Sequence, residues 1–175
     1  MEHPADIRKS LDVIERGAWS EWTGLQGEWP RSALESLGGG LRSCREHELG
    51  GKRVQRCELS LSRQPQPLQC FFDETGQVIL LRLEDPRSAD SWPALARELG
   101  VPSQRNALPR EHVYAPSAQY IFAARGITLY VVELPETTAS ILSAVSLYAP
   151  TSAETYLHGL GGDETIEFFD DPLPP

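Results

Sequence analysis

The pattern of apolar and polar residues gives its densest strand signal between Gln119 and Tyr148. Apolar side chains fill positions 120–124, as in a strand that is buried on both faces. Residues 127–132 then alternate with period two, and Gly126 permits a tight turn between the two runs. Residues 141–147 again place apolar side chains on one face. The pattern predicts a hairpin followed by a third strand.

A second set of strands is predicted in the first half of the chain. Residues 54–61 alternate, with Cys57, Leu59 and Leu61 on the inner face. Residues 68–72 and 77–83 form the clearest hairpin, because Gly76 suits the left-handed position of a bulged turn. Together with the later strands this gives six strands.

Helical spacing, capping residues and glycine stops predict short helices between these strands. They cover residues 5–16, 30–37, 92–99 and a segment that ends at Leu160. The fold class is therefore α+β. We expect one domain over residues 1–162, with an antiparallel sheet of about six strands and the helices on one face. Residues 41–53 are interpreted as a polar connection and residues 101–118 as a long loop.

Two segments share a pattern that indicates a tandem repeat. Trp29-Pro30 to Leu37-Gly38 and Trp92-Pro93 to Leu99-Gly100 each read as a short helix that a loop and strands follow. The repeats would span residues 29–91 and 92–160, side by side in one sheet.

This arrangement, over about Trp29 to Tyr148, resembles the tandem helix-plus-sheet fold of the β-lactamase inhibitor protein family. The resemblance implies a concave sheet that binds another protein. The chain departs from that family because we expect neither a secretion signal nor paired disulfides from its sequence. No functional residue can be carried over from the resemblance.

Charge and cysteine content narrow the classes of function. The net charge of -9 argues against general nucleic-acid binding and is compatible with a basic protein partner or simply with solubility. No apolar run is long enough to span a membrane, and residues 1–17 lack the apolar core of a signal peptide. We therefore expect a cytoplasmic protein whose three cysteines (Cys44, Cys57 and Cys70) are reduced.

Neither a catalytic motif nor a cofactor motif is present. Cys44 and His47 could form a nucleophile and base, but no third group orients them. A zinc site from Cys44, His47, Cys57 and Cys70 would have only one tight ligand pair, so small core side chains are the preferred interpretation of Cys57 and Cys70, and a surface thiol that of Cys44. Gly38-Gly39-Gly40 follows a helix, whereas a phosphate loop precedes one. We expect no catalytic residue, no metal and no cofactor.

Two charged segments remain open to interpretation. A basic cluster is interleaved with glutamates, which favours a self-paired surface over a site for an acidic or phosphate-bearing partner; its members are Arg42, Arg45, Lys52, Arg53 and Arg56. The tail, residues 163–175, carries five acidic residues and no basic ones. It could be a docking peptide, an added edge strand, a mimic of nucleic-acid charge or a plain terminus.

The sequence therefore favours a non-enzymatic protein-binding module, such as an immunity or inhibitor protein that occludes a cognate toxin. Aromatic residues outside the predicted strands are the candidate partner-binding residues: Trp19, Trp22, Tyr114, Phe168 and Phe169. The two tryptophans could equally lie in the core. The alternatives are a small-molecule-binding or enzymatic domain that uses the sheet, and a regulatory or assembly subunit that docks through its tail.

Overall fold

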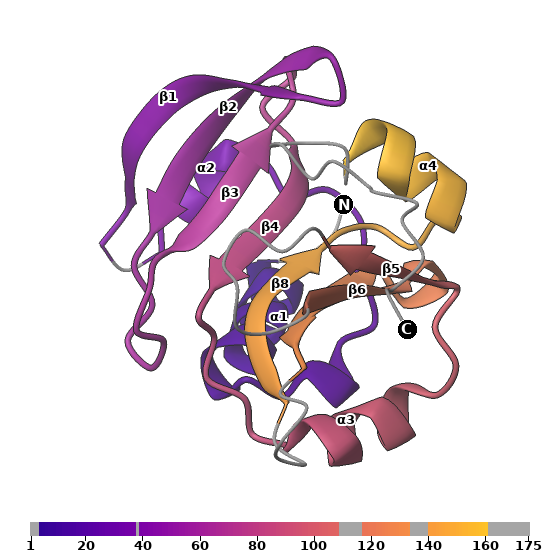
Figure 1. Ribbon diagram of the computed structural model, residues 1–175. Coiled ribbons are helices and arrows are strands. Elements are labelled where there is room, and N and C mark those ends of the chain that lie inside the picture. The colour runs from indigo at the N-terminus through magenta and orange to yellow at the C-terminus, as the bar shows by residue number, and fades with distance from the viewer. Residues whose placement is uncertain (1–3, 38, 109–116, 134–139, 161–175) are drawn as a thin grey trace.

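Eight antiparallel strands form one sheet, in the order β1-β2-β3-β4-β8-β7-β6-β5 (Figure 1). The computed structural model describes residues 4–37, 39–108, 117–133 and 140–160. The strand bounds are β1 (Leu41–Leu49), β2 (Lys52–Leu59), β3 (Leu68–Phe72), β4 (Val78–Glu84), β5 (Gln104–Leu108), β6 (Ser117–Phe122), β7 (Ile127–Val132) and β8 (Ile141–Leu147). The α+β class and the antiparallel sheet are confirmed. The predicted number of six strands is wrong, because β1 and β5 were interpreted as a connection and a loop.

The sheet consists of two four-stranded meanders, β1–β4 and β5–β8. They join where β4 pairs with β8, with Leu81 opposite Leu147 and Leu83 opposite Val145. A short helix precedes each meander, α2 (Arg31–Glu35) the first and α3 (Trp92–Leu99) the second. This connectivity is compatible with a tandem repeat, which itself stays a prediction.

Helices cover both faces of the sheet, not one. The helix α1 (Pro4–Arg16), with α2 and α3, shares a buried cluster with strand residues such as Phe72 and Leu81. The helix α4 (Ala153–Gly159) packs on the opposite face, in a cluster that contains the neighbouring residues Phe71 and Leu80. Figure 1 shows α4 on the near side of the sheet and α1 and α2 behind it. The prediction that all helices lie on one face is wrong for α4.

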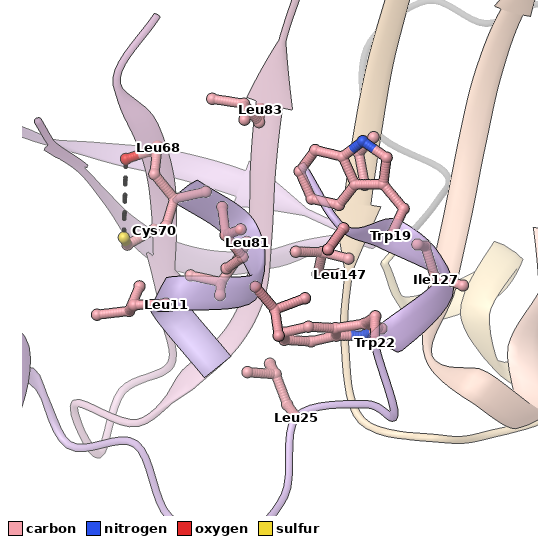
Figure 2. Close-up of a cluster of buried hydrophobic side chains, with 14 of the residues drawn as sticks. Leu11, Trp19, Trp22, Leu25, Leu68, Cys70, Leu81, Leu83, Ile127 and Leu147 are labelled. Atoms are coloured by element: carbon pink, nitrogen blue, oxygen red, sulfur yellow. Dashed lines mark hydrogen bonds between the residues drawn. The ribbon is translucent and has the colours of Figure 1, made fainter. Parts of the chain in front are cut away.

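The main core fills the space between the sheet and the segment that links α1 to α2. Trp19 and Trp22 are 0% and 2% exposed and pack against side chains from both meanders (Figure 2). The indole Nε1 of Trp22 donates a hydrogen bond of 2.9 Å to the carbonyl of Gly126. This short segment therefore fastens the N-terminal part of the chain to the second meander.

Cysteine pairing differs from the expectation of three reduced thiols. Cys44 and Cys57 form a disulfide between β1 and β2, with a Cα–Cα distance of 4.1 Å. A register shift between Arg42 and Arg45 places Cys44 near Cys57. Because residues 41–53 were interpreted as a connection, this cross-strand approach was not foreseen. Cys70 is a free, buried thiol, as expected for a small core side chain.

Thiol counting tests this pairing. Burial raises the pKa of the Cys70 thiol to about 12, so a native chain kept free of reductant should show no thiol that reacts with Ellman's reagent at neutral pH. Unfolding without reductant should expose one thiol, and unfolding after reduction should expose three. Three reactive thiols in the unreduced, unfolded chain would contradict the disulfide.

Within the described residues, no helix is long and apolar enough to cross a membrane. The cytoplasmic location stays a prediction.

Candidate functional site

The aromatic residues predicted to bind a partner do not form one surface. Trp19 and Trp22 are buried in the core, so they present no side chain to a partner and that part of the prediction is corrected. Their apolar rings fill the space between α1 and the sheet, which is the alternative that the sequence left open. Tyr114, Phe168 and Phe169 lie outside the described residues.

A different group of aromatic and charged side chains meets at the β5 side of the sheet. Four residues form this aromatic–arginine cluster: Trp92 at the start of α3, Arg105 on β5, Tyr120 on β6 and Glu133 just after β7. The rings of Trp92 and Tyr120 lie 4.8 Å apart with an interplanar angle of 56°. The guanidinium of Arg105 lies over the Tyr120 ring, 5.4 Å from its centroid.

Hydrogen bonds fix the polar ends of the cluster. Arg105 donates from Nε to the Tyr120 hydroxyl at 3.1 Å and from Nη2 to both carboxylate oxygens of Glu133 at 3.0 and 3.1 Å. The Tyr120 hydroxyl in turn donates to Glu133. Each polar group therefore holds the other two, and the guanidinium has one preferred orientation.

Secondary structure supplies this geometry. The antiparallel ladder places Arg105 directly opposite Tyr120, and Tyr120 opposite Leu129 on β7. Ser91 caps α3 by accepting a hydrogen bond from the amide of Ala94, so the helix begins with its tryptophan beside the sheet. The cluster is built on regular elements, which makes its positions rigid.

The cluster faces solvent, although its members are ordered. The side chains of Arg105 and Glu133 are 46% and 32% exposed, and both rings are half-buried. Such an exposed ion pair contributes at most about 1 kcal/mol to stability. The two large apolar residues that are exposed among the described residues lie close by in the chain: Val101 between α3 and β5, and Ile141, which pairs with Val132 beside Glu133.

A second polar network lies on the face of the sheet that α4 covers, and its side chains are buried. Gln119 donates to the Tyr130 hydroxyl at 3.1 Å, that hydroxyl lies 3.3 Å from the Tyr156 hydroxyl, and the Tyr148 and Tyr156 rings stack at 4.2 Å. Burial raises the pKa of Tyr148 and of Tyr156 well above the usual value for tyrosine. These hydroxyls stay protonated; that of Tyr148 lies 2.8 Å from the Thr128 hydroxyl and that of Tyr156 pairs with Tyr130, so the network anchors α4 to the sheet.

The predicted basic cluster lies on the β1–β2 hairpin. Among its five cations, Arg56 alone forms an ion pair with a described residue, with 3.9 Å to Glu58. The predicted self-pairing is therefore limited to Arg56. The hairpin also removes two zinc candidates, because Cys44 and Cys57 have no free thiolate while they are paired. Among the described residues, no group of three or more metal-ligating side chains meets.

Sequence reasoning missed the aromatic–arginine cluster because its members are far apart in the chain. Trp92 was interpreted as a helix start, Tyr120 as a strand residue and Arg105 as part of a long loop. The one available signal was that such loops are often functional.

Comparison of the chain with protein-family models, with curated proteins and with solved structures finds no match. The resemblance to the β-lactamase inhibitor protein family therefore stays a prediction.

Proposed function

We propose that this protein is a non-covalent protein-binding module whose recognition surface is the aromatic–arginine cluster. The observation that carries the proposal is that Trp92, Tyr120 and Arg105 are held together in a fixed, solvent-facing arrangement. Tryptophan, tyrosine and arginine are the residue types that dominate binding energy at protein interfaces.

Preorganisation strengthens this interpretation. A long arginine side chain normally loses rotamer freedom when it binds, which costs about 0.5–1.5 kcal/mol. Glu133 and Tyr120 already orient Arg105 in the free protein, so part of that cost is met before a partner arrives. Within the described part of the sheet, β5 is an edge strand beside the cluster, so its backbone offers a partner hydrogen-bonding groups.

The concrete form that we propose is an inhibitor or immunity protein that occludes a cognate toxin. The net charge of -9 supports this form, because an acidic protein associates rapidly with a basic partner. The captured partner should therefore be a basic protein with toxin activity. Capture of a partner without toxin activity would support a protein-binding function and contradict the proposal of an immunity protein.

Affinity capture from the native host tests the proposal. Wild-type bait should recover one dominant, stoichiometric protein, and Arg105→Ala should recover far less of it, because truncation of a central arginine typically costs about 2 kcal/mol or more. Arg63→Ala is the matched control, since Arg63 is an exposed arginine on another segment. Equal recovery by Arg105→Ala, or no partner for the wild type, would reject the cluster as the recognition surface.

A further inference from the structure

A groove of about 850 Å³ lies at the end of the sheet that contains the first meander, away from the edge strand β5. It is bounded by the tip of the β1–β2 hairpin, the β3–β4 turn, α4 and the segment around Leu25. Apolar side chains line much of it: Leu25, Leu49, Val54, Val78, Ile79 and Leu160. Its volume falls within the range of about 300–1,000 Å³ that is usual for small-molecule sites.

The walls of the groove are fixed by close backbone contacts. Gly50 has a φ of +57° at the hairpin tip, and a Cβ there would lie 2.5 Å from the Gly159 carbonyl oxygen, so hairpin and α4 touch backbone to backbone. The Leu25 amide donates to the Tyr148 carbonyl at 3.0 Å. In the β3–β4 turn, Asp73 accepts hydrogen bonds from the Thr75 and Gln77 amides at 2.9 and 3.0 Å. The cavity is thus preformed.

Charge is distributed unevenly around the rim. Lys52 and Arg53 are exposed on the hairpin side, and neither side chain forms an ion pair or hydrogen bond with any residue that the structure describes. On the turn side, the Asp73 carboxylate already accepts hydrogen bonds within the turn, while Glu74 is exposed. An anionic group therefore fits at the hairpin end, and Glu74 disfavours a second one at the turn end.

We propose that this groove binds a small amphipathic carboxylate. Its aliphatic chain lies against the apolar floor, and its single carboxylate lies at the hairpin end of the groove, where Lys52 and Arg53 line the rim. This site is separate from the aromatic–arginine cluster, so the proposal of a carboxylate site does not depend on the proposed protein partner. Charge complementarity at the rim distinguishes this occupant from a neutral or cationic one.

Calorimetric titration of the full chain with decanoate, and with decanol as the neutral analogue, tests the proposal. Decanoate should bind the wild type saturably at one site, at least about tenfold more tightly than decanol, because one charge-assisted contact is worth about that factor. Lys52→Glu with Arg53→Glu should remove this preference and leave decanol binding unchanged. Arg8→Glu with Arg97→Glu is the control, since it makes the same change in net charge on exposed helix residues.

Thr155→Arg provides a second variant that fills the groove from α4. Thr155 is exposed and lines the groove. The substitution loses the hydrogen bond that the Thr155 hydroxyl accepts from Ser152 but keeps the capping bond from the Thr155 amide to Ser152. This variant should abolish binding of both probes. No saturable decanoate binding to the wild type, as expected if a protein segment occupies the groove, would overturn the proposal. Equal affinity for decanoate and decanol, or binding that survives Thr155→Arg, would overturn it too.

Discussion

Trp22→Ala should lower the free energy of unfolding by about 3–5 kcal/mol, the range for truncation of a buried aromatic residue. Trp22 is 2% exposed, and its indole donates to the Gly126 carbonyl at 2.9 Å, so alanine leaves a cavity and removes one of the two hydrogen bonds to that carbonyl, which keeps the bond from the Tyr148 amide. Chemical denaturation followed by circular dichroism measures the change.

Trp22→Phe is the matched control for this substitution. It keeps an aromatic ring in the core and loses the hydrogen-bond donor, so it should cost clearly less than Trp22→Ala. A loss below about 1 kcal/mol for Trp22→Ala would place the side chain near the surface and restore it as a candidate contact residue.

Gly126→Ala should destabilise the protein by about 2–5 kcal/mol. Gly126 has a φ of +63°, and a Cβ there would lie 2.0 Å from the Tyr148 carbonyl oxygen. The left-handed conformation costs an L-residue about 1–2 kcal/mol, and overpacking against fixed backbone adds about 1–3 kcal/mol. Thermal and chemical unfolding of the purified variant measure the loss.

Gly76→Ala separates these two contributions. Gly76 has a φ of +78°, but a Cβ there would meet nothing within 4 Å. This variant should lose only the conformational part, about 1–2 kcal/mol. If both glycine variants lost the same stability, the close approach of Gly126 to Tyr148 would be wrong.

Periodicity in the sequence found the six inner strands and missed the two edges, for one physical reason. An inner strand must bury at least one face, which leaves an alternating or continuous apolar pattern. The edge strand β1 is exposed at most positions, and β5 has the sequence QRNAL, so neither shows that pattern. The cross-strand disulfide was missed as a direct consequence, because Cys44 lies on β1.

Placement of α4 could not be derived from its own residues. The sequence did contain a signal, since Phe71 and Phe72 are consecutive apolar residues on β3 and must face opposite sides. Both sides are buried, one by the main core and the other by α4. The aromatic–arginine cluster left no such local signal, because only the ladder register and the start of α3 bring its residues together.

The most direct test of the proposed binding surface is the dissociation constant of the captured partner, measured by calorimetry with wild-type protein, Arg105→Ala and Arg63→Ala. We predict a dissociation constant at least about 30-fold higher for Arg105→Ala, equivalent to about 2 kcal/mol, and no change for Arg63→Ala. The stability of Arg105→Ala should fall by less than about 1 kcal/mol, because its ion pair is exposed. A correctly folded Arg105→Ala that binds the partner within twofold of the wild type would contradict the account.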